Sequence, residues 1–403
     1  MRKKTAVNRK MIAVILSMMI ALCGCGGAQS SAPAVQNSAP AAQESEAAQT
    51  ETEAAQTETE AAQAETEAAQ TETEAAQAAQ VSEESSTAAG ELDAEAAEAP
   101  AAVHIAHRYA SKAEGQELLL SNEEYYNGFS QNDLDFKMQK KGAAMEEYKA
   151  FAVEQVEDFT EEEMDAADSI FREMEKTLEE NGYTLPPLDE IVLIKTTMEE
   201  ECGVTAYTHG TQIYMSEKLL GTYLSRMGDG TTTQLVRYVF WHEMFHCLTR
   251  CNPDFRAEAY KLIHFTVQED DYPLPPSVFE YHISNPDVEH HNSYATFRID
   301  GQNIDCFTDF VTTRHFEQEG DSFFDCATTA LIPVDGSDVY YTPEQAENFD
   351  EVFGTNTDYV IDPEECMADN FGYALAYGMD GPTGEGYPNP EIIEGIFAIL
   401  KAN

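Results

Sequence analysis

The chain has 403 residues, of which 23 are Lys or Arg and 74 are Asp or Glu, so its formal net charge is −51. This composition excludes nucleic-acid binding through clustered cationic side chains, and equally docking on an anionic membrane through a basic patch. The charge divides the chain into three stretches. Residues 1–27 carry five basic and no acidic residues, residues 28–100 carry sixteen acidic and no basic residues, and residues 101–403 carry 18 basic and 58 acidic residues.

The first stretch has the pattern of a secretory signal. Five basic residues precede residues 11–22, an uncharged apolar run that is shorter than the roughly 20 residues of a membrane span. The run ends Leu22-Cys23-Gly24-Cys25, and Leu-x-Gly-Cys resembles the bacterial lipobox, in which the last Cys is lipidated after cleavage before it. The resemblance implies a signal peptide over residues 1–24 and a lipid on Cys25 that anchors the protein at the bacterial cell surface, facing outside. An ordinary secretion signal with two incidental cysteines is the alternative.

The second stretch contains almost no large apolar side chain. It consists of Ala, Gln, Glu, Thr, Ser and Pro, and a seven-residue unit recurs between about Ala47 and Glu74. A coiled coil is not expected from this period, because its seam would hold Ala, Gln or Thr and bury too little apolar area to offset chain entropy. We therefore expect residues 25–102 to form a disordered acidic tether.

Residues 103–403 are expected to form the folded domain, since they are numerous enough to bury a sizeable core. Residues 104–158 are expected to be helical. A capping box beginning at Thr160 starts a helix that Asn181-Gly182 ends. Further helices are expected at residues 216–225, 231–249, 255–265, 362–378 and 390–403.

Strands are expected at three places in this domain. Residues 191–194 form a short branched apolar run, and residues 204–215 have the pattern of a hairpin with a turn at residues 208–211. Residues 266–361 are rich in aromatic and β-branched residues, with a hairpin whose turn is Asp300-Gly301. Helices, a few strands, paired helices, a β-rich insertion and helices again predict an α+β fold.

One expected helix carries a motif of metal chemistry. His242, Glu243 and His246 form H-E-x-x-H, so the two imidazoles project from one helical face towards a single tetrahedral zinc ion. Glu243 is placed to act as the general base on a zinc-activated water and then to protonate the leaving nitrogen. The alternative is a helix with two core histidines and a solvated glutamate.

A zinc enzyme of this kind needs a third protein ligand, and the best candidate lies towards the C-terminal end of the chain. Glu365 and Asp369 stand four residues apart in the expected helix at 362–378. This pattern resembles the Glu-x-x-x-Asp helix of the thermolysin-like zincins, the gluzincins. The resemblance implies a zincin-like fold in which Glu365 ligates zinc and Asp369 orients His242 from behind. Glu258 and Glu364 remain alternative ligands, Glu364 being expected to face another way.

Other parts of the resemblance concern the substrate. Because 119 residues separate His246 from Glu365, the β-rich residues 266–361 are expected to be an insertion beside the cleft that contributes to substrate selection. In zincins an edge strand aligns an extended peptide, a role that falls here on Ala206, Tyr207 and Thr208, although an ordinary hairpin is an equal alternative. The candidates for a transition-state donor are His291 and Tyr294, followed by His290 and Tyr373.

The cysteines leave their pairing open. Six follow the tether, and six allow fifteen connectivities. Cys247 and Cys251 lie one helical turn apart, so a second zinc pair is conceivable, but no other cysteine pair at a zinc-binding spacing supports it.

Together these features predict a lipid-anchored zinc metallopeptidase that hydrolyses peptides or proteins. The membrane is contacted only through the lipid anchor. The alternative is a non-catalytic surface binding lipoprotein built on a zincin scaffold; a solute-binding lipoprotein is less consistent, because it would require a doubly wound pattern of alternating strands and helices. The acidic residues of 101–403 are expected to be spread evenly, which keeps an exposed domain soluble. If they cluster near the cleft instead, basic peptides are the substrates to try first.

Overall fold

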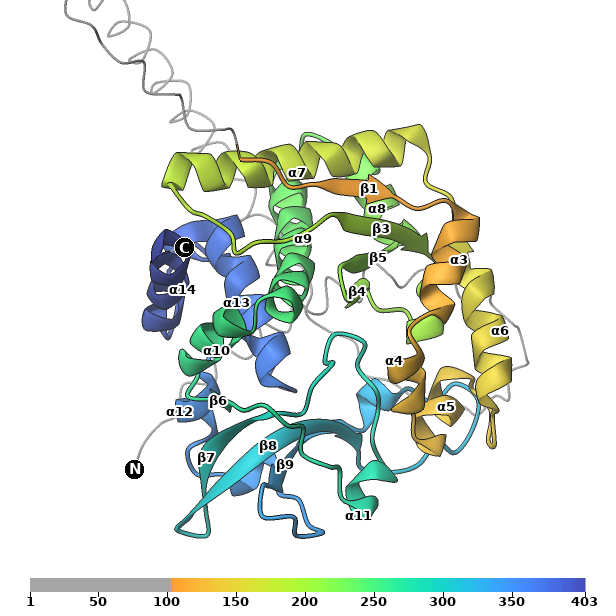
Figure 1. Ribbon diagram of the computed structural model, residues 1–403, viewed down its shortest axis with the longest axis vertical. Coiled ribbons are helices and arrows are strands. Elements are labelled where there is room, and N and C mark those ends of the chain that lie inside the picture. Colours follow the sequence, from red (N-terminus) through yellow and green to blue (C-terminus); the bar gives the residue numbers. More distant parts are fainter. Residues whose placement is uncertain (1–102, 403) are drawn as a thin grey trace, which may run out of the picture. The chain divides into compact units, whose positions relative to one another are not determined.

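The protein is described by a computed structural model that covers residues 103–402 (Figure 1). The expected signal peptide, the lipidation site Cys25 and the tether at 25–102 lie outside these residues. Within the described part the fold is α+β, with one five-stranded and one four-stranded sheet. The expected fold class is thus confirmed at this level.

The five-stranded sheet carries the edge that later faces the functional site. Its main path runs β1 (His107–Tyr109), β3 (Ile191–Thr196), β5 (Gln212–Ser216), β4 (Ala206–His209), and β2 (Val156–Glu157) pairs with β3. The β1/β3 and β3/β5 pairs are parallel, whereas β4 pairs antiparallel with β5. β3 is buried along its whole length, as its branched apolar residues predict. Strand β4 therefore forms one edge of the sheet, and the expected hairpin at residues 204–215 is confirmed.

Residues 104–158 are not entirely helical, contrary to expectation. They contain α3 (Lys112–Leu120), α4 (Glu123–Asn127), α5 (Gln131–Lys137) and α6 (Met145–Gln155), but also the strands β1 and β2. These two strands have three and two residues, too few to show a period in the sequence. They form because β5 covers only one side of β3, and the other side offers backbone partners to β1 at residues 191–193 and to β2 at residues 195–196.

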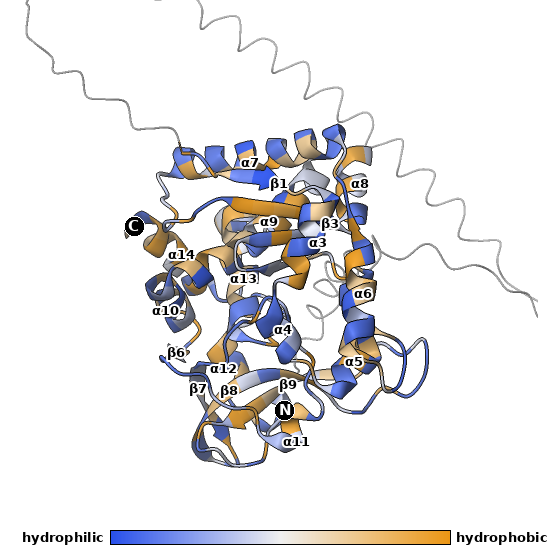
Figure 2. Ribbon diagram, turned by 45° about the vertical axis from the view of Figure 1, so that its right-hand side comes forward, coloured by the Kyte–Doolittle hydropathy of each residue, from blue (hydrophilic) through white to orange (hydrophobic). Residues whose placement is uncertain are grey.

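Helix α7 (Glu161–Asn181) begins and ends where the sequence predicted. Thr160 and Glu163 form the capping box, and Gly182 ends the helix with a φ of 63°. Figure 2 shows polar and apolar positions alternating along α7, as expected of a helix that buries one face. The buried face packs in the main core with strands β3 and β5.

Two further helices form the centre of the molecule. α9 (Gly230–Cys251) is capped by Asp229, and α13 (Pro363–Tyr377) by Asp362; each side chain accepts a hydrogen bond from the first turn of its helix. Both helices are buried along most of their length and pack against each other. Contact is close because Gly372 on α13 faces the ring of Tyr238 on α9. The remaining α-helices of this region are α8 (Glu217–Ser225), α10 (Pro253–Lys261) and α14 (Pro390–Ala402).

The four-stranded sheet lies in the β-rich stretch. Its strands are β6 (Thr266–Val267), β7 (Ser293–Ile299), β8 (Gln302–Thr312) and β9 (Ala327–Pro333), in that order and antiparallel throughout. The expected β7–β8 hairpin is confirmed, and its turn residues Asp300 and Gly301 both have positive φ, at 49° and 74°. Short helices complete the stretch and the chain: α11 (Pro276–Phe279), α12 (Phe349–Phe353), and the 3₁₀ turns Glu199–Glu201, Phe323–Asp325, Pro343–Gln345 and Gly378–Asp380.

The structure also bears on membrane-spanning helices and on the state of the cysteines. In the part of the chain that the structure describes, no helix has the length and apolar character needed to cross a bilayer. All six cysteines of this part are free thiols, and Cys247 is buried while Cys251 is exposed.

Candidate metal centre

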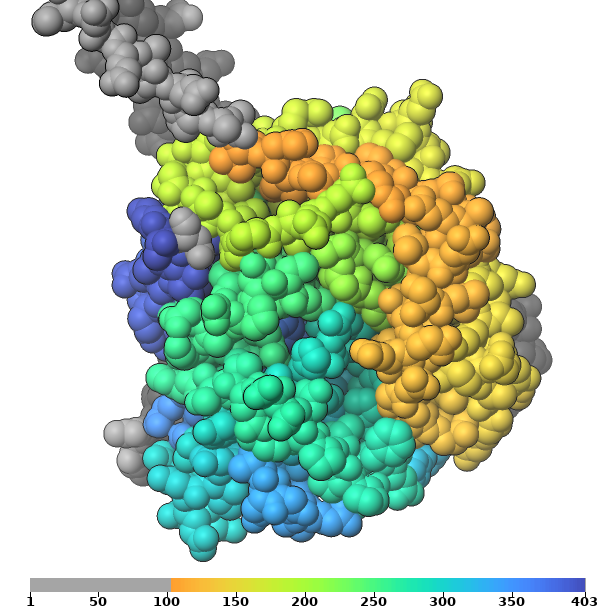
Figure 3. Space-filling view, viewed as in Figure 1, coloured from red at the N-terminus to blue at the C-terminus, as the bar shows by residue number. Residues whose placement is uncertain are grey.

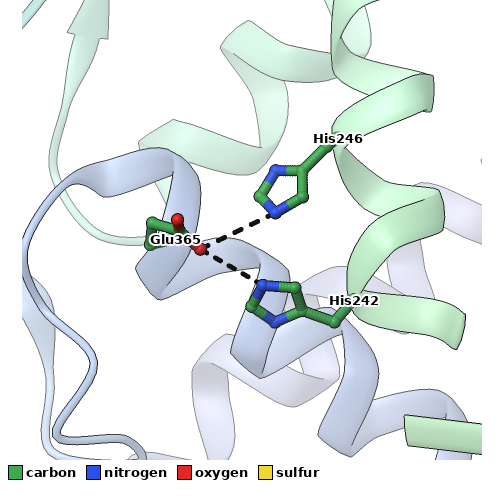
Figure 4. Close-up of side chains that lie close together, drawn as sticks. All are labelled: His242, His246 and Glu365. Carbon is green, nitrogen blue, oxygen red and sulfur yellow. Dashed lines mark hydrogen bonds and ion pairs between the residues drawn. The ribbon is translucent and has the colours of Figure 1, made fainter. Parts of the chain in front are cut away.

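Two packed helices bring three ligand-type side chains together. His242 and His246 come from consecutive turns of α9, and Glu365 comes from the first turn of α13 (Figure 4). Oε2 of Glu365 lies 3.1 Å from Nε2 of His242 and 3.6 Å from Nε2 of His246. All three side chains are buried, with exposed fractions of 9%, 0% and 1%.

This group has the chemistry of a metal site. Tetrahedral zinc holds His nitrogen and carboxylate oxygen at about 2.0–2.2 Å, which separates neighbouring donor atoms by roughly 3.4 Å. The distances from Oε2 of Glu365 to the two histidine nitrogens, 3.1 and 3.6 Å, lie on either side of that value. Nε2 of His246 is also buried and has no hydrogen-bond partner within the protein. The three residues therefore fit a metal ion held between α9 and α13.

Each histidine has its own carboxylate behind it. Nδ1 of His242 donates to Asp369 (3.0 Å), the contact implied by the gluzincin resemblance, and Nδ1 of His246 donates to Glu364 (3.0 Å). Both Nε2 atoms are thereby turned towards Glu365. Glu364, considered above only as an alternative ligand, does face another way, and there it meets the second histidine.

The two supporting carboxylates are themselves fixed by hydroxyl groups. Asp369 accepts hydrogen bonds from Tyr238 and Thr357, and Glu364 accepts from Thr249 (2.6 Å) and Tyr260. Although burial works against ionisation, the bond from His246 keeps the pKa of Glu364 below its ordinary value. The imidazole orientations are thus determined by networks that reach α9, α10 and the chain before α13.

Glu365 is held by residues from two other segments. Asn285, in the loop before β7, donates to its Oε1, and Tyr359 donates to the same atom (3.2 Å). Burial opposes its ionisation, but hydrogen bonding from His242 and the charges of both histidines lower its pKa to about 2. Glu365 therefore presents an ionised carboxylate to the centre.

Glu243 lies beside the group with a free oxygen. It is 4% exposed, and its Oε2 has no hydrogen-bond partner within the protein. Its ligand-type oxygen falls within 4.8 Å of His246 and of Asp287, a second set that shares His246 with the first. Burial and the charge of Asp287 raise the pKa of Glu243 to about 8. Its carboxylate is thus poised to hold or release a proton near neutrality.

Several candidate residues lie away from the group. Glu258 is exposed and pairs with Lys261, so the structure does not bring it to the histidines. His291 lies 3.7 Å from Asp309, and Tyr294 pairs with Thr266 in the β6–β7 ladder. Neither makes a contact with His242, His246 or Glu365 among the described residues. Of the further donor candidates, His290 pairs with the exposed Asp271, and Tyr373 stacks on Tyr238.

The hairpin residues do lie near the centre. Ala206, Tyr207 and Thr208 are on β4, and the backbone N–H of Thr208 donates to the carboxylate of Asp287 (2.7 Å). Asp287 in turn lies 4.0 Å from Nε2 of His246. The edge strand and the histidines are therefore linked through one side chain.

Sequence reasoning missed three of the residues at the centre. Tyr359, Asn285 and Asp287 come from segments without a periodic pattern, and no motif marks them. The nearest signal was Asn285-Pro286-Asp287, which has the residue types of a turn and is followed by the noted pair His290 and His291.

A cavity of about 530 Å³ adjoins the centre on the side of β4 and α4. One wall is the loop of Asn285, Pro286, Val288 and Glu289. His209 on β4 forms part of another wall, and its buried Nε2 has no hydrogen-bond partner within the protein. Asn285 both lines the cavity and contacts Glu365, so the loop is the partition between the cavity and the metal-binding group.

In comparisons with protein-family models, with curated proteins and with solved structures, the chain matched none of them.

Proposed function

We propose that this protein is a zinc-dependent peptidase with a zincin-like domain. The observation that carries the proposal is the convergence of His242, His246 and Glu365 on one point, with the unpartnered carboxylate of Glu243 beside it. When bound, zinc supplies a Lewis acid that polarises a peptide carbonyl and activates water.

The residues of the chain have distinct roles in this proposal. Glu243 takes the proton from the attacking water and delivers it to the leaving nitrogen, for which its raised pKa suits it. Asp369 and Glu364 hold the imidazoles in the orientation that directs both Nε2 atoms to the ion. Tyr359 replaces His291 and Tyr294 as the candidate transition-state donor, because its hydroxyl lies at Glu365 and its ring stacks near His242.

The setting of the enzyme also remains a proposal. The lipobox at Cys25 supports a lipid-anchored protein at the bacterial cell surface, and the substrate is then a peptide or protein outside the cell. Residues 25–102 serve as the tether, and residues 266–361 stand as the β-rich insertion beside the cleft.

The test is the replacement Glu243→Gln in the full chain. We expect this variant to bind one zinc ion like the wild type, measured by mass spectrometry of the native protein, and to lose cleavage of a broad peptide library by about 10²-fold or more. Wild-type cleavage should stop on addition of a chelator and return with zinc. Glu258→Gln, at an exposed position away from the centre, is the matched control. Undiminished cleavage by Glu243→Gln would contradict the proposed mechanism.

A second candidate function is a non-catalytic surface binding lipoprotein on a zincin scaffold. The nearly complete burial of the three ligands favours it, because a substrate has no direct path to them. Stoichiometric zinc together with no cleavage of any peptide would support this candidate. The carboxylate of Glu243 argues against it, because a buried acid without a partner costs stability and has no structural use.

A further inference from the structure

The loop between α11 and β7 reaches into the metal centre. In Figure 1 this connection rises from the four-stranded sheet to the level of β4. Within it, Asn285 donates to Glu365, and Oδ1 of Asp287 lies 4.0 Å from Nε2 of His246. Asp287 is buried, and its ligand atom shares a 4.8 Å neighbourhood with those of Glu243 and His246. A further carboxylate thus stands beside His246 and Glu243.

The same loop occupies the edge of β4. Oδ1 of Asp287 accepts hydrogen bonds from the backbone N–H (2.7 Å) and the hydroxyl (2.6 Å) of Thr208, and Glu289 accepts from the N–H of Gly210 (3.0 Å). The N–H of Thr208 belongs to β4 and is turned towards Asp287, whereas Gly210 follows β4 in the turn to β5 and has a φ of 56°. An extended peptide that adds to this edge would meet one donor on the strand and one just beyond its end.

Arg250, at the end of α9, clamps the loop in place. Its guanidinium donates to the backbone carbonyls of Pro286 and Asp287, each at 3.0 Å, and its Nε lies 2.8 Å from the carboxylate of Glu289. It also donates to the hydroxyl of Thr208 and the carbonyl of Gly210. One side chain on the active-site helix therefore ties loop and edge strand together.

We propose that Asp287 is a further carboxylate of the metal site, and that the segment Asn285–Glu289 occupies the substrate's place along β4 and keeps the enzyme latent until it is displaced. This inference rests on the proposed peptidase function. In the space-filling view of Figure 3, teal atoms of this part of the chain fill the surface between the green and the orange segments.

Displacement of the segment would open the site without unfolding the core. Pro286, Val288 and Glu289 already border the cavity of about 530 Å³, so movement of this wall joins the cavity to the metal-binding group. The donors left behind, namely the N–H groups of Thr208 and Gly210 and the guanidinium of Arg250, would then bind backbone carbonyls of an incoming peptide. A bound peptide would thus satisfy with its carbonyls the donors that Asp287 and Glu289 satisfy in the closed form.

Three variants of the full chain test the inference. Asp287→Ala removes the carboxylate and the acceptor for Thr208, Asp287→Asn removes the charge but keeps an acceptor, and Glu289→Ala releases Gly210. Asp270→Ala, at an exposed position between β6 and α11, is the matched control.

Three measurements are made on each variant. Amide hydrogen exchange of the zinc-free protein should be at least ten-fold faster at Thr208 in Asp287→Ala and at Gly210 in Glu289→Ala. Zinc affinity, measured by competition with a chromophoric chelator, should fall about 10-fold or more in Asp287→Ala and Asp287→Asn. Peptide cleavage at saturating zinc should rise at least ten-fold in Asp287→Ala and Glu289→Ala, and Asp270→Ala should behave like the wild type throughout.

The outcomes separate the inference from the function on which it rests. If the wild type cleaves peptides and neither Asp287→Ala nor Glu289→Ala is faster, the latent role of the segment is overturned and the peptidase stands. Unchanged exchange at Thr208 or unchanged zinc affinity in Asp287→Ala equally overturns it. If zinc-loaded wild type and all variants cleave nothing, the peptidase function itself fails. If Asp287→Ala does not fold, the zinc affinity of Asp287→Asn and the amide exchange at Gly210 in Glu289→Ala decide the test.

Discussion

At the scale of single residues, the two histidines of the motif are distinguished by what stands behind them. Asp369 orients His242 from the opposite helix, and Glu364, five residues earlier, orients His246. The motif of α9 therefore has a matching set of carboxylates on α13. Helix α13 thus provides three carboxylates with different roles within little more than one turn, namely Glu364, Glu365 and Asp369.

We predict that Asp369→Asn lowers zinc affinity by about 10- to 100-fold, because the neutral amide no longer strengthens His242 as a donor. Glu364→Gln should have an effect of the same order through His246. Zinc affinity measured by chelator competition tests this, with the exposed Asp380→Asn as the control. Equal affinities in Asp369→Asn and the control would show that the contact serves packing alone.

Glu200 is a buried carboxyl outside the metal-binding group, and it makes stability depend on pH. Burial raises its pKa to about 7, its Oε1 accepts from Tyr207 (3.0 Å), and its Oε2 has no partner within the protein. Between its ordinary pKa of 4.5 and about 7, the folded state holds a proton that the unfolded state has lost. Stability therefore falls as pH rises through this window, by about 3 kcal/mol from this group.

We predict that Glu200→Gln removes this loss and is more stable than the wild type at pH 8 by a few kcal/mol. The amide keeps the acceptor for Tyr207 and has no charge to bury. Urea denaturation at pH 5 and pH 8 measures the effect. The exposed neighbour variant Glu199→Gln should follow the wild type. If the stability of Glu200→Gln falls between pH 5 and pH 8 as much as that of the wild type, Glu200 is not the group responsible. Other buried acids such as Asp362 are present in every variant, so their contributions cancel in the comparison.

At the scale of elements, the site depends on how closely α9 and α13 approach. A Cβ at Gly372 would lie 2.9 Å from the ring of Tyr238 and 3.1 Å from its carbonyl oxygen. Since Tyr238 also donates to Asp369, a shift at this contact is passed directly to the carboxylate that orients His242. The glycine is thus required by close packing, because its neighbours leave no room for a side chain.

We predict that Gly372→Ala destabilises the protein by about 1–3 kcal/mol and weakens zinc binding, although alanine favours a helix elsewhere. Gly221→Ala on α8 is the control, because a Cβ there meets nothing within 4 Å and should stabilise by up to about 1 kcal/mol. Thermal unfolding and zinc titration of both variants test the prediction. If Gly372→Ala stabilises the protein, α9 and α13 can move apart without loss of stability, and the prediction is wrong.

The elements that sequence predicted best are those with a local signal. The helix with H-E-x-x-H, the helix launched by Asp362-Pro363 and the hairpin at Asp300-Gly301 each carry a cap, a period or a turn within a few residues. Strands β1 and β2 carry none, since they exist only as partners of β3. The loop that places Asp287 was likewise beyond prediction, because its position depends on contacts with β4 and α9.

At the scale of the whole molecule, the acidic excess is the dominant physical property. Residues 101–403 carry 18 basic and 58 acidic residues, and the acidic side chains at the centre are hydrogen-bonded by histidines and hydroxyl groups. The remaining carboxylates repel one another, which destabilises the compact state at low ionic strength. Salt screens this repulsion over about 10 Å at 0.1 M.

We predict that the Tm of the zinc-free full chain rises by several degrees between low salt and about 0.5 M NaCl, as followed by calorimetry. An equimolar concentration of an uncharged solute serves as the control for non-ionic effects. A Tm that stays constant or falls would show that local ion pairs, such as Lys137 with Glu201, outweigh the overall repulsion.

The sequence by itself determined the features that lie within one helical turn or one hairpin. His242, Glu243 and His246 share a face because α-helical spacing puts them there, and Glu365 and Asp369 share a face for the same reason. Only the tertiary structure decided that these faces meet, and that Asp287 arrives between them and β4. Such contacts join residues about 80 to 120 positions apart, and they are selected by packing and by the pairing of buried charges, which local sequence patterns do not encode.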